Sequence, residues 1–406
     1  GVAKTLRDTL NELNRAPVDP ELRYELLETL RPSLTQTLTL LDRMLVNQPL
    51  VMPPRLQALA ALSDQIGGLA CTAYSICVMQ AAREPARITR RAPARLVCEA
   101  LEHALHYGAH KVVLALNLQL PIESRTWSTL HQTYLLGERY RLTELTVPGA
   151  GGGESSIRNT WLVPLLLACC QTGQLLRSDI AVLHAALRES VAGCRLRPGA
   201  EAEGLFAVDL NGASPPVYRS SMAMPGKQVR LLDTSDLIAS ATRARDTARK
   251  AGRSAALLGE TRVPLPLLDH LLDCLGSERE RANRRVIVSE PLQAVLGFSA
   301  AHFHLAGERA LEDLVQKPRN RAASHSKENP FLVERKDDDP WAATHDTDRS
   351  HSSLNRDGSI NVLARARTER EAPTELPANY SIVRVTTVDA SPGGYCLDWG
   401  ANAPGT

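Results

Sequence analysis

Aromatic residues are scarce in this chain. Phe, Tyr and Trp together make up 4% of its 406 residues, whereas hydrophobic residues of all kinds make up 43%. The core must therefore be built mostly from aliphatic side chains, and the abundant Leu and Ala are typical of packed helices. A low aromatic count together with a helical scaffold fits a binding protein better than an enzyme.

An excess of either charge sign is missing as well. The chain has 47 Lys and Arg against 45 Asp and Glu, a formal net charge of +2. Electrostatics therefore give no support for a nucleic-acid polymer as a partner. One basic series runs from Arg83 to Arg95, but Glu84 and two prolines interrupt it, and we interpret it as a solvated connector.

Long apolar runs and paired cysteines are also lacking. The longest strongly apolar run, Trp161 to Cys170, is too short to span a bilayer, and the charged start of the chain is unlike a secretory signal. The eight cysteines contain no C-x-x-C pair, so no zinc or thioredoxin-like motif is indicated. Scattered thiols in apolar stretches suit a reducing compartment. We expect a cytoplasmic protein without membrane insertion.

Leucines recur at helical spacing through the first 200 residues. The stripe Leu27, Leu30, Leu34, Leu38 and Leu41 is one example. No fixed repeat emerges, so the pattern predicts antiparallel helix pairs in a helical bundle or an α-solenoid. Further helices are expected over about 56–78, 93–105, 111–120, 124–142, 156–174 and 177–194.

Residues 201–280 are a predicted mixed segment. A strand over 204–210 ends at an Asn-Gly turn, and helices return at 236–250 and 264–281. Upstream, the glycine-rich stretch 148–153 lacks the Gly-Lys-Ser/Thr ending of a phosphate-binding loop, and we interpret it as a flexible linker.

Two short motifs near the C-terminus point to a ligand. Asp389-Ala390-Ser391-Pro392-Gly393-Gly394 lies between the strand-like runs 380–388 and 395–397. Asp and Ser side chains can bond a turn or a ligand, and Gly lets backbone approach closely. Further upstream, Arg281-Ala282-Asn283-Arg284-Arg285 precedes the strand-like run 286–289.

These motifs resemble the two signatures of PilZ domains, R-x-x-x-R and D/N-x-S-x-x-G, which bind cyclic di-GMP. The resemblance implies that guanidinium groups bind phosphate and guanine, while the Asp-containing turn shapes the other side of the site. A plain hairpin turn is the alternative interpretation of the second motif. The ligand-binding residues that the resemblance implies are Arg281, Arg284, Arg285, Asp389, Ser391 and Gly394.

A polar insertion over about 317–378 separates the motifs, and it holds too few apolar residues to fold alone. Its Asp337–Trp341 segment is interpreted as a solvated linker, with a short anchoring motif through Trp341 as the alternative. Strands that would complete a barrel after the second motif are expected either beyond Thr406 or to be absent.

The predicted fold is therefore mainly α: a helical bundle or α-solenoid followed by a small PilZ-like β-barrel region, complete or incomplete. Three parts are expected: an N-terminal helical domain over 1–200, the mixed segment 201–280, and a PilZ-like β region over 281–406.

Other chemistry is weakly indicated. His103, His106 and His110 share one helix face, a spacing that can bind a metal, but no further ligand cluster completes the set, and we interpret them as ordinary histidines. His302 and His304 alternate in a strand-like run and would face the same side. Because no nucleophile elbow or dinucleotide fingerprint occurs, we predict no catalytic residue, metal or cofactor.

The sequence thus predicts a cytoplasmic cyclic di-GMP receptor or effector rather than an enzyme. A helical domain would transmit nucleotide binding to an unidentified protein partner. The alternative is a helical interaction scaffold with a degenerate, non-binding PilZ-like region.

Overall fold

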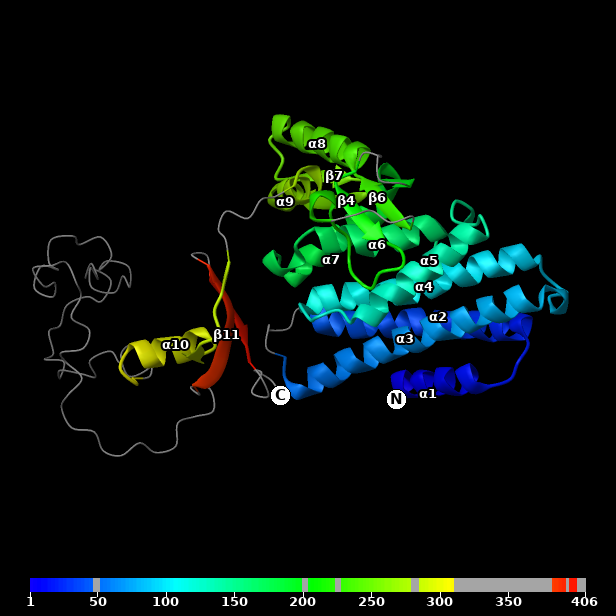
Figure 1. Ribbon diagram of the computed structural model, residues 1–406, viewed down its shortest axis with the longest axis horizontal. Helices are drawn as coiled ribbons and strands as arrows, with labels where there is room; N and C mark the ends of the chain where they lie inside the picture. The colour runs from blue at the N-terminus through cyan, green and yellow to red at the C-terminus, as the bar shows by residue number, and fades with distance from the viewer. Residues whose placement is uncertain are drawn as a thin grey trace, which may run out of the picture. The chain divides into compact units, whose positions relative to one another are not determined.

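The computed structural model describes residues 1–46, 52–198, 204–222, 228–278, 285–309, 382–391 and 394–399. The chain divides into two compact units, Gly1–Ala282 and Asn283–Pro404 (Figure 1). Arg281, Arg284 and the whole polar insertion over 317–378, including Trp341, lie outside the described residues.

Unit 1 begins with a layered set of long helices. Helix α4 is central, because α3, α5 and α6 all pack against it, and α2 and α3 run beside it (Figure 1). Its 26 residues form one continuous helix, so the separate helices expected at 93–105 and 111–120 are a single element. The bounds are α1 (Val2–Arg15), α2 (Pro20–Val46), α3 (Pro54–Arg83), α4 (Pro93–Leu118), α5 (Ser124–Arg139), α6 (Ile157–Cys169) and α7 (Arg177–Ser190), with short 3-10 turns η1 (Pro85–Arg87), η2 (Thr172–Gln174) and η3 (Val191–Gly193).

The basic connector between α3 and α4 forms ion pairs with residues at the start of α2. Arg87 pairs with Asp19 at 3.1 Å and Arg90 with Glu25 at 3.1 Å, so the connector is held against the start of α2.

The predicted glycine-rich linker is instead an ordered hairpin, formed by β1 (Thr146–Pro148) and β2 (Glu154–Ser156). Its turn is docked on α4: the amide of Ala150 donates to Glu102 Oε2 at 3.0 Å. A Cβ on Gly151 would lie 2.8 Å from His106 Cε1, so only glycine fits this approach. The linker interpretation is wrong, because contacts with α4 that no local pattern reveals hold the loop in place.

A small antiparallel sheet and two more helices complete unit 1. The predicted strand at 204–210 is present as β4, and Phe206, Val208 and Leu232 join the same hydrophobic core as the first helices. The strand order is β3-β6-β4-β5, and β7 pairs with β8. The bounds are β3 (Arg195–Pro198), β4 (Phe206–Asp209), β5 (Val217–Tyr218), η4 (Arg219–Ser221), β6 (Val229–Asp233), α8 (Ser235–Lys250), β7 (Ala255–Leu258), β8 (Thr261–Pro264) and α9 (Leu265–Gly276).

Unit 2 contains an antiparallel sheet in which the long strand β11 pairs with β9, β10 and β12. The expectation of a helical part followed by a small β region is thereby confirmed. The bounds are β9 (Val286–Ile287), β10 (Pro291–Ala294), α10 (Phe298–Leu305), β11 (Val383–Ser391) and β12 (Gly394–Asp398).

One expectation for unit 2 is wrong. The strand-like run expected to hold His302 and His304 is instead helix α10, which begins after Gly297. His302 and His304 therefore do not share a face, since residues two apart on a helix point in different directions. The run is apolar enough for either element, and periodicity alone does not separate them at this length.

Across the part of the chain that the structure describes, no helix is both long and apolar enough to cross a bilayer. All eight cysteines are free thiols, and seven of them are buried. Burial raises the pKa of the Cys71 thiol to about 11, so buried thiols of this kind stay protonated and behave as small hydrophobes.

Candidate functional site

One residue of the first motif, Arg285, meets the second motif at the sheet of unit 2. Arg285 comes directly before β9, and Asp389 lies on β11 opposite Ile287 of β9. The guanidinium Nη1 of Arg285 donates to Asp389 Oδ2 at 3.0 Å. Antiparallel pairing of β9 with β11 therefore brings together two side chains that the sequence separates by 104 positions.

This contact involves only one of the two carboxylate oxygens of Asp389. Its side chain is 20% exposed and that of Arg285 is 47% exposed. The second carboxylate oxygen, Oδ1, is buried and has no hydrogen-bond partner among the described residues. A buried acceptor without a partner is costly, so this oxygen is ready to accept a donor from a ligand.

The described remainder of the second motif lies where β11 and β12 end their pairing. Ser391 pairs with Gly394 at the end of the β11–β12 ladder, and the Ser391 hydroxyl donates to the carbonyl of Gly394 at 3.3 Å. Gly394 has φ +147°, a conformation that L side chains rarely adopt. The two residues between them lie outside the described part of the chain.

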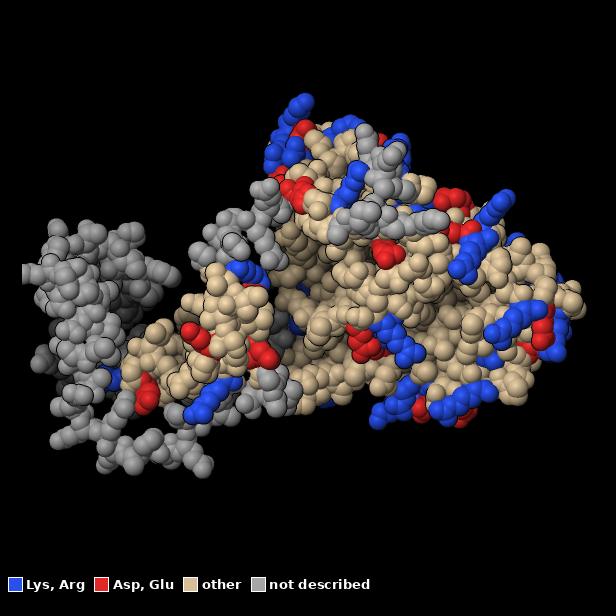
Figure 2. Space-filling view, in the orientation of Figure 1, with Lys and Arg blue, Asp and Glu red and all other residues tan. Residues whose placement is uncertain are grey.

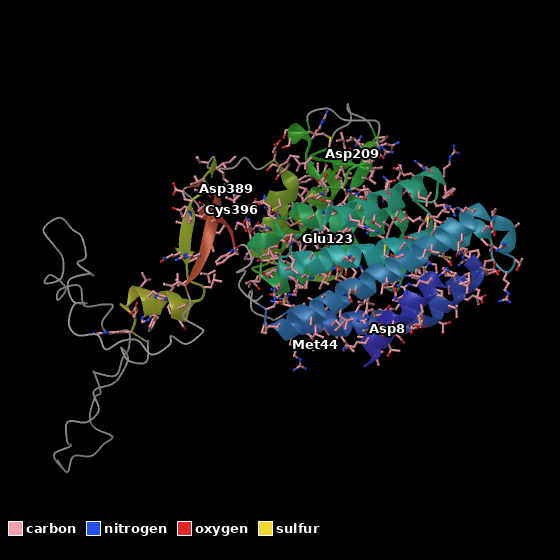
Figure 3. The ribbon with its side chains drawn as sticks, turned by 60° about the horizontal axis from the view of Figure 1, so that its bottom comes forward. Asp8, Met44, Glu123, Asp209, Asp389 and Cys396 are labelled. Atoms are coloured by element: carbon pink, nitrogen blue, oxygen red, sulfur yellow. The ribbon has the colours of Figure 1, made fainter. Side chains whose placement is uncertain are left out.

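Strand alternation shows which side chains share the face of Asp389. Ser391 is two residues further along β11 and faces the same side. Cys396 of β12 lies directly opposite Asp389, as Figure 3 shows, and Ile287 lies opposite it on β9. Neither Cys396 nor Ile287 was predicted from the sequence, although counting in steps of two from Asp389 and across the hairpin identifies Cys396.

A register shift between Thr387 and Asp389 marks the start of the site. Thr387 is buried, and its hydroxyl accepts from the amide of Glu290 at 2.8 Å and lies 3.0 Å from the Glu290 carbonyl. These bonds tie β11 to the connection between β9 and β10. A bulge bends its strand and changes the direction of the side chains that follow, which here begin with Asp389.

Of the residues predicted to bind a ligand, the structure brings together Arg285, Asp389, Ser391 and Gly394. Arg281 and Arg284 lie outside the described residues. A ligand in this site would meet one guanidinium, one carboxylate oxygen that is open to donors, and a tight turn.

The histidines of α4 contact different partners and do not converge on one point. His103 Nδ1 lies 2.8 Å from Glu102 Oε2, and its Nε2 lies 3.3 Å from Glu28 Oε1 of α2. His110 Nε2 lies 3.1 Å from Asp42. Within the described ranges, no group of three or more His, Cys, Asp or Glu is arranged to hold a metal.

The buried His103 is held in its charged form. Burial by itself lowers the pKa of His103, but hydrogen bonds and charge from Glu102 and Glu28 outweigh it and raise the pKa to about 9. For His106, burial outweighs the charge of Glu102, and the pKa is lowered to about 4. This polar network inside the helices was not predicted, because Glu28 is distant in the sequence.

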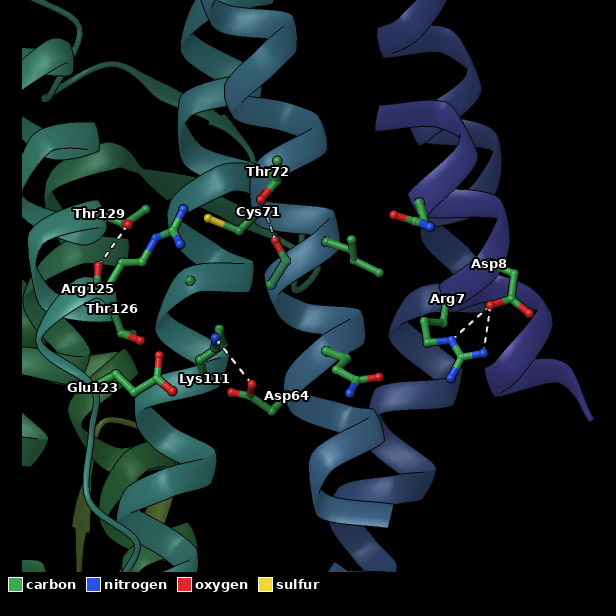
Figure 4. Close-up of a pocket in the computed structure, with 15 residues that line it drawn as sticks. Arg7, Asp8, Asp64, Cys71, Thr72, Lys111, Glu123, Arg125, Thr126 and Thr129 are labelled. Carbon is green, nitrogen blue, oxygen red and sulfur yellow. Dashed lines mark hydrogen bonds and ion pairs between the residues drawn. The ribbon is translucent and has the colours of Figure 1, made fainter. Parts of the chain in front are cut away.

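A cleft of about 740 Å³ opens among α1, α3, α4 and α5 (Figure 4). Its walls carry charges of both signs, some of which pair locally. Lys111 Nζ lies 3.3 Å from Asp64, and Arg7 Nη2 lies 2.7 Å from Asp8. Such a lining suits a polar segment of another protein better than an apolar small molecule.

Two family models match the chain. The model for the cyclic-di-GMP receptor FimW N-terminal domain matches residues 2–201, and the model for the FimW middle PilZ domain matches residues 205–406. The boundary between them falls inside unit 1: β3 belongs to the first match, whereas its sheet partners β4, β5 and β6 belong to the second.

A curated relative, the cyclic-di-GMP receptor FimW of Pseudomonas aeruginosa, is 26% identical over 426 residues. The alignment covers 99% of this chain and 67% of that relative. No solved structure matches the chain.

Proposed function

The chain belongs to the FimW family of cyclic-di-GMP receptors, and from this premise we propose that it binds cyclic di-GMP on unit 2, beside Arg285, Asp389 and the Ser391–Gly394 hairpin. The observation that carries the proposal is the 3.0 Å contact between Arg285 and Asp389, which joins one residue of each motif. The other carboxylate oxygen, Asp389 Oδ1, is buried and has no hydrogen-bond partner among the described residues.

Each group has a chemical task in this proposal. A guanidinium can bind phosphate oxygens in a forked pair, or the O6 and N7 acceptors of guanine. The Asp389 carboxylate accepts N–H groups from a guanine edge. Arg281 and Arg284 would add donors from the preceding segment, and Ser391 and Gly394 keep the turn tight so that backbone can approach the ligand.

Calorimetric titration with cyclic di-GMP tests this site, with cyclic di-AMP as the comparison ligand. Arg285→Ala should weaken binding roughly tenfold or more, because a charge-assisted hydrogen bond is lost. Arg384→Ala is the matched control, since Arg384 is an exposed arginine on the same strand, five residues from Asp389. Failure of the unaltered protein to bind cyclic di-GMP would reject the receptor assignment.

The protein acts as a binding protein rather than an enzyme in this proposal. Residues 281–406 sense the nucleotide, residues 1–200 recognise a protein partner, and segment 201–280 connects them. The cleft among α1, α3, α4 and α5 is the concave surface available to that partner. The free thiols suit a reducing cytoplasm.

Hydrogen exchange tests the transmission. Saturating cyclic di-GMP should change amide protection in α1 and α3 as well as in β11 and β12, because a signal requires different affinities for two arrangements of the protein. Changes confined to unit 2 would contradict a role of the helical domain in passing on the signal.

A further inference from the structure

A second charged concavity lies in unit 1, between α8 and the β7–β8 hairpin. It encloses about 530 Å³, and three guanidinium groups line it, those of Arg243, Arg253 and Arg262. Its floor is apolar and includes Ala248 and Ala256, both buried. Lys and Arg side chains gather at the end of the unit that carries α8 (Figure 2). We call this concavity the arginine pocket.

The end of α8 fixes the position of Arg253. The amide of Gly252 donates to the carbonyl of Arg249 at 3.0 Å, and the amide of Arg253 donates to that of Ala248 at 2.9 Å. This bond pair is a Schellman cap, which satisfies the last carbonyls of the helix. Arg253 is therefore held one residue beyond the turn, at the rim of the pocket.

The hairpin register fixes the position of Arg262. Arg262 of β8 lies opposite Leu257 of β7, and both are exposed. Their neighbours Ala256 and Val263 are buried, so strand alternation turns Arg262 and Leu257 away from the core, and both line the arginine pocket. Leu257 is 60% exposed, which leaves an apolar surface beside the guanidinium.

None of the described residues that line the arginine pocket is Asp or Glu. Three nearby carboxylates are engaged elsewhere: Asp246 pairs with Arg245 at 3.0 Å, Asp269 pairs with Arg249 at 2.7 Å, and Glu189 accepts from the amide of Thr261 at 2.9 Å.

Among the described residues, no carboxylate lies within ion-pair distance of Arg243, Arg253 or Arg262. Arg243 donates only to the hydroxyl of Ser240, at 3.3 Å. Three like charges around one concavity repel one another, and a bound anion relieves that repulsion.

We propose that the arginine pocket binds the phosphate groups of a small anionic ligand, at a site separate from the one on unit 2. Guanidinium groups match phosphate oxygens in geometry and charge. The volume falls within the range of small-molecule sites, and the apolar floor leaves room for a ring. Nucleoside triphosphates and free polyphosphate chains share this chemistry.

Titration of the full chain with ATP, tripolyphosphate and adenosine tests the pocket. ATP and tripolyphosphate should bind and adenosine should not, because phosphate supplies the contacts. Arg253→Ala and Arg262→Ala should each weaken ATP binding roughly tenfold. ATP binding tighter than tripolyphosphate identifies a nucleotide as the ligand, whereas the reverse order identifies a polyphosphate chain.

Lys250→Ala is the matched control, because it removes one positive charge from the last turn of α8 without changing the lining of the pocket. Equal losses in Lys250→Ala and Arg253→Ala would overturn the proposal, since they would indicate a diffuse field rather than a site. Absence of ATP and tripolyphosphate binding would overturn it as well.

The double variant Arg253→Ala/Arg262→Ala should keep its affinity for cyclic di-GMP, and Arg285→Ala should keep its affinity for ATP. This pair of results separates the two sites, so that either one can fail while the other stands. Loss of cyclic di-GMP binding in the double variant would overturn the separateness of the arginine pocket.

Discussion

Arg285 and Asp389 are 104 positions apart in the sequence, and their side chains form an ion pair of 3.0 Å between the start of β9 and its neighbour β11. Both side chains are partly exposed, and ion pairs in such surroundings contribute about 0–1 kcal/mol to stability. The pair is therefore a weak structural element that positions two charged groups.

Asp389→Asn tests this division between stability and binding. We expect the free energy of unfolding to change by less than about 1 kcal/mol in denaturant titrations. Affinity for cyclic di-GMP should fall roughly tenfold, because the amide replaces one acceptor with a donor facing guanine N–H groups. A large loss of stability with unchanged affinity would assign Asp389 a structural role only.

Thiol labelling offers a second test of the site. Seven cysteines are buried, and Cys396 alone is partly exposed. A thiol reagent should therefore modify about one thiol quickly in the native protein, and Cys396→Ser should abolish that fast phase. Because Cys396 lies opposite Asp389, cyclic di-GMP should slow its labelling. Labelling at an unchanged rate under saturating nucleotide would place the ligand elsewhere.

The turn of the second motif depends on Gly394. Its φ of +147° disfavours any side chain, although a Cβ there would meet no atom within 4 Å. Gly394→Ala should therefore cost about 1–3 kcal/mol through backbone strain alone. Amide exchange in β11 and β12 should accelerate and nucleotide affinity should fall.

Gly173→Ala is the control for this substitution, because Gly173 is equally unobstructed and has no positive φ. If both variants exchange at the unaltered rate, the turn is not under the strain that its φ implies.

His103 makes stability depend on pH. Its pKa is raised to about 9 in the folded protein, whereas an unfolded imidazole titrates near 6.5. The folded state therefore keeps a proton that the unfolded state releases. This stabilisation is complete below pH 6.5 and is lost as the pH rises through about 9.

We expect the free energy of unfolding to fall by roughly 2–3 kcal/mol between pH 6.5 and 9, measured by denaturant unfolding. His103→Gln should remove most of this slope and destabilise the protein at pH 6.5. His304→Gln, in unit 2, controls for the substitution itself. An identical slope in His103→Gln would show that other groups cause the pH dependence.

The local elements follow from the sequence. The leucine stripes predict the helices of the first 200 residues, and the helix expected at 236–250 is α8, Ser235–Lys250. The strand expected at 204–210 is β4. These elements are readable because their periodicity extends over enough residues to identify a buried face. Both ligand motifs are readable because they are contiguous.

Tertiary structure decided the rest. Helix α10 forms where a strand was predicted. An apolar run of eight residues can form either element, and its tertiary surroundings decide which one is stable. The glycine-rich loop is ordered by Glu102, and His103 is charged because Glu28 reaches it from α2.

The meeting of Arg285 with Asp389 depends on the pairing of β9 with β11, and no local pattern sets a register across such a distance. Local residue patterns thus predict the helices and the motifs. Long-range strand pairing and packing determine which charged residues share a site, because contacts between distant residues produce no periodic pattern in the sequence.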